Sequence, residues 1–298
     1  MKNSQYQGNR IINSVIRITG YSSILFVLLI LFFLLREGLP ALGSTPLASL
    51  FSLRWYPIEG YFGIVPLILG SLLVTVIATL IALPFGICTA VFLAEVAPSW
   101  LRDILKPIIE ILAGIPSVVL GFIGILVFVP FIRKFLDIPT GLTAFTGALL
   151  LGLISIPTIV SVAEDALNTV PGSYRQAALA LGATQWQTIW HVTLPAAKSG
   201  VLTAVMLGIG RSLGETMAVM MVTGNAPVMP VHLNSIFAPV RTMTATIASE
   251  MGEVASGSQH YQVLFFIGII LFLLSLVINI SASLVSTRSR GRAERLLS

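Results

Sequence analysis

The chain has 298 residues, of which 56% are hydrophobic and only 10% are charged, with a formal net charge of +5. Soluble globular domains carry roughly 25% charged residues, so this composition excludes an ordinary soluble domain and indicates a membrane protein. The basic residues are dispersed, which argues for contact with lipids and excludes a nucleic-acid-binding module. One cysteine and three scattered histidines make a metal site improbable.

Six apolar segments are each long enough to cross a membrane once, because a helix needs about 20 apolar residues to span the hydrocarbon core. Five contain no Asp, Glu, Lys or Arg, and the fifth in chain order carries Arg211 and Glu215 near its middle. The segments are residues 18–35, 60–94, 111–132, 138–163, 196–222 and 261–287. The sequence therefore predicts an all-α polytopic membrane protein with six transmembrane helices.

Three parts are predicted along the chain. Residues 1–62 hold a basic arm expected at the cytoplasmic membrane surface, the first span, and an outer loop whose Trp55 and Tyr56 are expected at the membrane interface. Residues 63–287 hold the other five spans, and residues 288–298 form a basic tail. Lys and Arg gather in the segments that are cytoplasmic if both termini are cytoplasmic, so this orientation is the one predicted.

A polar segment at 173–195, between the fourth and fifth spans, is predicted to form two short helices joined by a sharp turn on the cytoplasmic side. Two capping-box patterns start these helices; they are Ser173 with Gln176 and Thr184 with Gln187. Gly182 is expected to end the first helix in the left-handed conformation, and Pro195 to end the second. Such a compact knob suits docking into another protein, whereas the alternative is a solvated inter-helix loop.

The fifth span carries the candidate site. At 100° per residue, six of its positions fall within an arc of about 80°. They are Gly200, Ala204, Gly208, Arg211, Glu215 and Ala218. Small residues at Gly200, Ala204 and Gly208 favour close helix packing, as does Gly210-x-x-x-Gly214 beside this face. Charged residues at membrane depth normally face a bundle interior or a wet cavity. We therefore expect a pore-lining helix that presents Arg211 and Glu215 to a solute.

The chemistry of this pair points to an oxyanion. The guanidinium of Arg211 offers a rigid fork of donors that matches phosphate, sulfate or carboxylate oxygens. Glu215 could accept a hydrogen bond from a protonated oxyanion while repelling a fully ionised one, which favours hydrogen phosphate over sulfate. Because the two residues lie one helical turn apart, the alternative is an intrahelical ion pair that only cancels charge.

Prolines interrupt two other spans. Pro116 is expected to break the third span near its cytoplasmic end, and Pro157 to interrupt the fourth. Ser117 could then donate a hydrogen bond to a passing anion, although a packing kink is the alternative. Glu164 and Asp165, near the cytoplasmic end of the fourth span, are expected to be solvated.

The sequence lacks the chemistry of an enzyme. It contains no G-x-x-x-x-G-K-[ST] loop for a nucleotide, no nucleophile with a base and no metal set, so neither a catalytic site nor a cofactor of its own is expected. An ion-coupled secondary transporter is a second class, but it would usually need more spans and an internal repeat, and would not need the capped hairpin.

The hairpin resembles the EAA loop of ABC importer permeases, whose pattern is E-A-A-x3-G-x9-I-x-L-P. The matching residues, with Gln176 in place of Glu and Val192 in place of Ile, are Gln176, Ala177, Ala178, Gly182, Val192, Leu194 and Pro195. The phrases GIPSVVLGFIG at 114–124 and GRSLGETMAVMMVTGN at 210–225 are similar to those of phosphate permease subunits of the PstC type.

The resemblance implies a MetI-like (type I importer) core of five helices plus one N-terminal helix, in the bacterial inner membrane. It also implies a second permease of the PstA type, two cytoplasmic ATPase subunits that bind ATP and Mg²⁺, and a phosphate-binding protein outside. Sulfate or molybdate is the alternative substrate. The residues that would couple to the ATPase are Ser173, Gln176, Ala177, Ala178, Gly182, Leu194 and Pro195, whereas Arg211, Glu215 and Ser117 would belong to the anion path.

Overall fold

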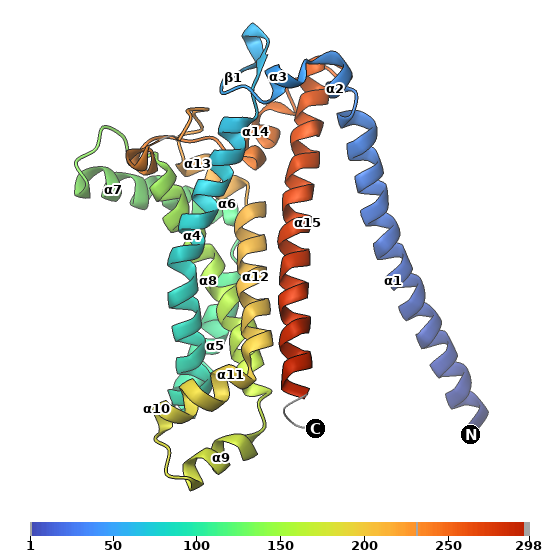
Figure 1. Cartoon of the computed structure of the whole chain (residues 1–298), viewed down its shortest axis with the longest axis vertical. Helices are drawn as coiled ribbons and strands as arrows, with labels where there is room; N and C mark the ends of the chain where they lie inside the picture. The colour runs from blue at the N-terminus through green and yellow to red at the C-terminus, as the bar shows by residue number, and fades with distance from the viewer. Residues whose placement is uncertain (1, 231, 295–298) are drawn as a thin grey trace.

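The computed structural model describes residues 2–230 and 232–294. Its long helices are α1 (Lys2–Gly38), α4 (Val65–Val91), α8 (Ala144–Asn168), α12 (Lys198–Gly214) and α15 (Gln259–Glu294). Figure 1 shows α4, α8, α12 and α15 running alongside one another, while α1 diverges and meets α15 only near one end. The rings of Phe33 and Phe265 lie 6.3 Å apart at that contact.

Shorter elements connect the long helices. They are α2 (Ala41–Ser44), α3 (Leu47–Leu50), β1 (Trp55–Tyr56), η1 (Pro57–Glu59), β2 (Tyr61–Phe62), the π turn η2 (Phe92–Val96), α5 (Ser99–Gly114), α6 (Ser117–Ile123), the π turn η3 (Gly124–Phe128), α7 (Val129–Phe135), α9 (Gly172–Ala180), α10 (Gln185–Thr188), the π turn η4 (Ile189–Thr193), α11 (Leu194–Ala196), α13 (Met217–Val222), η5 (Leu233–Phe237) and α14 (Met243–Glu250). The two strands pair antiparallel, with Trp55 opposite Phe62.

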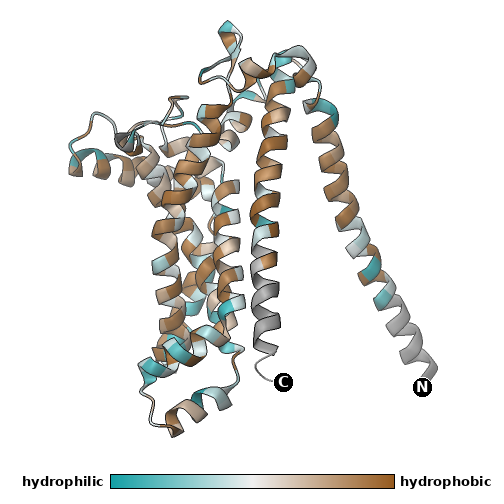
Figure 2. Cartoon of the chain, in the orientation of Figure 1, coloured by the Kyte–Doolittle hydropathy of each residue, from teal (hydrophilic) through white to brown (hydrophobic). Residues whose placement is uncertain are grey.

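The prediction of an all-α polytopic membrane protein is confirmed. Five helical segments of the described chain are long and apolar enough to cross a membrane, and the number is six if Gln185–Ala196 and Lys198–Gly214, which are bent by 73° to each other, are counted as one span. The five are Asn13–Ser44, Val65–Val96, Ser117–Phe135, Ala144–Asn168 and Gln259–Ser281. Figure 2 shows hydrophobic residues along these helices and hydrophilic ones on the hairpin of α9 and α10.

Helix α8 lies at the centre of the bundle, packed between α4 and α12. The buried side chain of Ile159 fits against Gly86 of α4 and Gly208 of α12, where an added Cβ would come within 2.7 and 2.5 Å of it. Gly200 of α12 lies against Ala166 of α8 in the same way. Ala204, between Gly200 and Gly208 on α12, is fully buried. The stripe of small residues on α12 therefore faces α8, where it permits close approach of the two helices.

The loop end of the bundle, which carries Ala41–Phe62 and α14, is integrated with the core. Trp55 is buried there, so the expectation that it anchors at the membrane interface is wrong. Its Nε1 donates to Glu250 at 3.2 Å, and its ring meets those of Phe62 and His260 edge-on. Glu250 also pairs with Arg241 at 2.6 Å and contacts His260 at 2.8 Å. This network joins the outer loop to α14 and α15.

The two ends of the chain differ from expectation in one respect. Helix α1 is continuous from Lys2, so the basic arm prolongs the first span and is not a separate surface helix. Likewise α15 continues as a helix to Glu294, into the segment predicted as a basic tail. Residues 295–298 of that tail lie outside the described residues. The start of α1, the end of α15 and the hairpin of α9 and α10 all lie at the same end of the bundle (Figure 1).

Candidate functional site

The span with the candidate charges is broken at Glu215. Helix α12 ends at Gly214, because Glu215 takes an extended conformation (φ −69°, ψ 131°) and a new helix, α13, begins at Met217. The helical wheel that placed Glu215 and Ala218 on the arc of Gly200 therefore fails beyond Gly214. Ala218 is instead buried and approaches Gly121 of α6.

The carboxylate of Glu215 accepts hydrogen bonds from backbone amides at the start of α13. Its Oε1 accepts hydrogen bonds from the backbone N–H groups of Thr216 at 3.1 Å and Ala218 at 3.4 Å. A carboxylate at this position satisfies donors that have no partner within the helix. Among the described residues Glu215 forms no ion pair with Arg211, so the alternative of an intrahelical pair that cancels charge is not what the structure adopts.

Arg211 is held by two other helices. Its Nη1 donates to Thr158 of α8 at 2.8 Å, and its Nη2 donates to the carbonyl of Ala113, near the end of α5, at 3.3 Å. Chain residues Ile115 and Pro116 then separate α5 from α6, whose first residue is Ser117. The break predicted at Pro116 is thus present, and the guanidinium of Arg211 lies beside it.

Helix α8 is not interrupted at Pro157, and here the prediction is wrong. The helix runs from Ala144 to Asn168 with Pro157 inside it. The neighbouring hydroxyls bind α12 instead: Ser155 contacts Ser212 at 2.8 Å in the buried core, while Thr158 accepts from Arg211. Sequence reasoning missed Ser155, Thr158 and Ser212 as partners, although two of them flank the proline.

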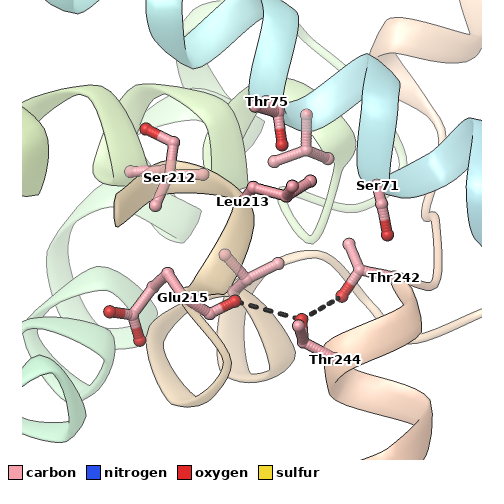
Figure 3. Close-up of a pocket in the computed structure, with 10 residues that line it drawn as sticks. Ser71, Thr75, Ser212, Leu213, Glu215, Thr242 and Thr244 are labelled. Carbon is pink, nitrogen blue, oxygen red and sulfur yellow. Dashed lines mark hydrogen bonds between the residues drawn. The ribbon is translucent and has the colours of Figure 1, made fainter. Parts of the chain in front are cut away.

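A small cavity lined by hydroxyl groups lies next to the break in the helix at Glu215 (Figure 3). Its free volume of about 10 Å³ fits roughly one water molecule. The hydroxyls that line it belong to Ser71, Thr75, Ser212, Thr242 and Thr244. Thr244 donates to the backbone oxygen of Glu215 at 3.1 Å and contacts Thr242 at 3.2 Å, whereas the Glu215 carboxylate is directed away from both (Figure 3). The cavity therefore supports the broken backbone and is too small for an oxyanion.

The face of α12 next to Arg211 is left open by the chain itself. An added Cβ at Gly210 or Gly214 would meet nothing within 4 Å. Leu207 on the preceding turn of α12 is also exposed, at 47%. The Gly210-x-x-x-Gly214 element thus packs against no other described part of this chain, in contrast to Gly200 and Gly208.

The predicted hairpin is present, and two of its local signals are confirmed. Thr184 and Gln187 form a full capping box at the start of α10. Gly182 has φ +85°, and the N–H groups of Gly182 and Ala183 donate to Leu179 and Ala178 in the Schellman pattern that ends α9.

Two other signals are wrong. Helix α9 begins after Pro171, so Ser173 lies inside its first turn and makes no cap. The residue before the helix is Pro171, which has an extended ψ of 133° and forms no side-chain cap. The second helix ends at Ala196, one residue after Pro195, because the π turn η4 lets the chain pass into α11 before it bends.

The hairpin presents an exposed apolar surface. Leu181 at its tip is 90% exposed, and Trp186 and Trp190 are 61% and 62% exposed. Gln176 and Ala177 lie exposed on α9. The opposite side is buried, since Ile189 lies in one apolar cluster with Leu93 of η2 and Leu167 of α8. The hairpin thus leaves two tryptophans and a leucine uncovered by the described part of this chain.

Glu164 is not solvated, contrary to expectation. It is buried and accepts from Lys106 of α5 at 3.1 Å and from Asn168 at 3.1 Å, whereas Asp165 stays exposed. The hydrogen bond to Glu164 raises the pKa of Lys106 above its usual value. Within the described residues no three of His, Cys, Asp and Glu gather as they would around a metal ion.

Comparison with known proteins decides the family. Residues 82–291 match the model of the binding-protein-dependent transport system inner membrane component. The chain belongs to this family of importer permeases. The stretch of the permease that matches runs from α4 to α15 and includes the hairpin, so the family named from the EAA-like loop is confirmed.

Named relatives extend over most of the permease. It is 42% identical over 250 residues to a probable ABC transporter permease, YqgH, of Bacillus subtilis, covering 83% of this chain and 80% of the relative. It is 35% identical over 312 residues to the phosphate transport system permease PstC of Pasteurella multocida, covering 95% and 96%.

Solved structures share the fold. A chain of the inward-facing MetNI methionine ABC transporter aligns with a TM-score of 0.61 at 18% identity, covering 79% of the permease and 99% of that chain. A chain of a bacterial alginate ABC transporter aligns with a TM-score of 0.59 at 16% identity, covering 90% and 93%. The permease therefore has the MetI-like fold of type I importers and is a multi-pass protein of the inner membrane.

Proposed function

We propose that the permease carries inorganic phosphate into the cell as a subunit of an ATP-driven importer. The observation that carries this proposal is its 35% identity to a PstC phosphate permease along nearly the whole chain. Arg211 supports it chemically, because a partly buried guanidinium at membrane depth is costly unless it meets an anion or a set of acceptors. Its two protein acceptors, Thr158 and Ala113, leave further guanidinium N–H groups for a phosphate oxygen.

The anion path follows the open face of α12. Arg211 lies beside the unfilled stripe of Gly210 and Gly214 and binds the carbonyl of Ala113, and Ser117 begins the helix that follows the break at Pro116. Glu215 binds backbone amides through Oε1, and no partner of its Oε2 is found among the described residues. That oxygen can accept a hydrogen bond from hydrogen phosphate, whereas it repels the fully ionised sulfate.

The second wall of the path comes from a partner permease of the PstA type. Small residues with nothing beside them allow another helix to approach closely, and Gly210-x-x-x-Gly214 is such an element. A soluble phosphate-binding protein would deliver the anion at the loop end, with both termini and the hairpin on the cytoplasmic side. Lys and Arg gather in the segments that this orientation makes cytoplasmic.

Cytoplasmic ATPase subunits, one on each permease, bind and hydrolyse ATP with Mg²⁺. The hairpin docks into one of them through its exposed face, which includes Gln176, Leu181 and Trp186. When ATP closes the ATPase dimer, the two hairpins are drawn together and the attached helices change their tilt. The permease contributes the conformational change and the selectivity, while its partners contribute the hydrolysis.

Co-purification tests the coupling. A tagged permease expressed with its partner subunits should retain the ATPase in detergent, and the double variant Leu181→Ser/Trp186→Ser should lose it, because exposed aromatic anchors dominate interface energies. The matched control is Phe135→Ser, since Phe135 is 72% exposed on α7, away from the hairpin. A wild-type permease that retains no ATPase subunit would contradict the proposed function.

A further inference from the structure

The cytoplasmic end of α4 forms a socket for the hairpin. The socket is the π turn η2 (Phe92–Val96), which closes with a hydrogen bond from the N–H of Ala97 to the carbonyl of Phe92 at 2.7 Å and is followed by Pro98. A π turn leaves carbonyl groups outside the regular ladder and is frequent at functional sites. Arg102 of α5 donates to two of these carbonyls, those of Leu93 at 2.8 Å and Ala94 at 2.9 Å.

Both helices of the hairpin form hydrogen bonds with Glu95 of this π turn. Arg175 of α9 binds the Glu95 carboxylate through Nη2 at 2.6 Å and through Nε at 3.0 and 3.1 Å. Gln185 of α10 donates its side-chain amide to the backbone oxygen of Glu95 at 2.9 Å. Arg175 also donates to the carbonyls of Leu167, in the last turn of α8, and of Val170, just beyond it. Two side chains of the hairpin, 80 and 90 residues later in the sequence, therefore meet at Glu95.

The pair is largely removed from water, since the side chains of Glu95 and Arg175 are 8% and 24% exposed. Burying two charges is costly, so the pair is weak evidence for stability alone. What a planar fork on a carboxylate does provide is a fixed orientation between the two elements that carry them. The apolar contact beneath it, where Ile189 meets Leu93, continues the same joint.

Motion delivered to the hairpin can reach the bundle through the chain itself or through side-chain contacts. The chain leads directly into α8 at one end of the hairpin and, through the bend at Ala197, into α12 at the other. The side-chain route leads through Glu95 into α4, which packs along α8 at Gly86 and Ile159. Gln176 is neutral and exposed, so the ion pair that joins the hairpin to the bundle, among the described residues, is Glu95 with Arg175.

We propose that Glu95 and Arg175 are positioning residues that transmit the movement of the ATPase-bound hairpin to α4, in addition to the covalent routes through α8 and α12. This inference rests on the proposed function. It predicts that removal of the joint separates transport from ATP hydrolysis without preventing the hairpin from docking, because the exposed docking residues Gln176, Leu181 and Trp186 are not part of the joint.

The test uses the complete transporter in liposomes, with hydrolysis measured before and after addition of the phosphate-loaded binding protein. The double variant Glu95→Gln/Arg175→Gln removes both charges, so no unpaired charge stays buried. We expect it to retain the ATPase subunit and the basal hydrolysis, while the stimulation and the phosphate imported per ATP fall about fivefold or more, the lower range of coupling between sites. The matched control, Arg36→Gln/Glu37→Gln, removes an ion pair at the loop end and should keep wild-type stimulation.

Wild-type stimulation in the double variant would overturn the inference and leave the pair a role in folding only. Should the double variant fail to assemble, Arg175→Lys decides the question: it keeps the charge but loses the fork, and stimulation equal to wild type would again overturn the proposal. A wild-type transporter that the phosphate-loaded protein does not stimulate would overturn the proposed function itself, and this inference with it.

Discussion

Arg211 and Glu215 are four residues apart in the sequence, yet they bind different parts of the molecule. Arg211 donates to Thr158 of α8, whereas Glu215 lies in extended backbone after α12 and accepts from the amides of α13. The break separates the two charges instead of joining them in a pair. Their roles in the proposed anion path can therefore be tested separately.

Replacement of Arg211 tests the anion contact. Arg211→Gln should lower the rate of labelled phosphate uptake about ten- to hundredfold, because hydrogen bonds to charged groups contribute about 1.5–3 kcal/mol and each 1.4 kcal/mol is tenfold. Arg211→Lys should recover only part of the loss, since an ammonium lacks the planar fork. Arg133→Gln is the control, as Arg133 is exposed on α7. Wild-type uptake by Arg211→Gln would remove Arg211 from the path.

Replacement of Glu215 tests selectivity. A glutamine can still accept the amide hydrogen bonds that start α13, so Glu215→Gln should fold and assemble normally. It no longer repels a fully ionised anion, so competition by sulfate against phosphate uptake should increase. The measurement is labelled phosphate uptake with rising sulfate. If both uptake and discrimination are unchanged, Glu215 has no role in selection.

Two glycines of α12 form a matched pair for packing. Gly208→Ala would bring a Cβ within 2.5 Å of the buried Ile159, and overpacking of this kind costs about 1–3 kcal/mol. Gly210→Ala meets nothing within 4 Å, so in the isolated permease it should be neutral or slightly stabilising. Thermal unfolding of the two variants in detergent compares them. Equal melting temperatures would contradict the packing of α12 on α8.

The Lys106–Glu164 contact predicts a pH dependence of stability. Because the folded-state pKa of Lys106 is raised, its contribution is fully present below the unfolded value of about 10.4 and is lost only as pH rises through the folded value. The difference in unfolding midpoint between wild type and Lys106→Met should therefore stay constant from pH 6 to about 9.5 and shrink above it. A difference that changes near neutral pH would contradict this assignment.

Local patterns predicted the spans, the hairpin and the small-residue stripe of α12, since each depends on periodicity or on one turn of chain. Tertiary contacts decided what the patterns could not. At the break, the hydroxyl of Thr244 donates a hydrogen bond to the backbone oxygen of Glu215. Trp55 is held in its buried position by a hydrogen bond to Glu250, 195 residues later. From the sequence, Arg175 was only one of the basic residues that predicted the orientation, whereas the structure shows that it pairs with Glu95. Such pairings follow from the packing of distant helices, which a single sequence does not display.

Anion-resolved transport tests the central claim most directly. The complete importer, reconstituted in liposomes with its binding protein and ATP, should accumulate labelled phosphate and should take up sulfate and molybdate at no more than background rates. Accumulation should stop when ATP is replaced by a non-hydrolysable analogue. Uptake of sulfate or molybdate in preference to phosphate, or uptake that continues without ATP hydrolysis, would contradict the assignment of this permease to ATP-driven phosphate import.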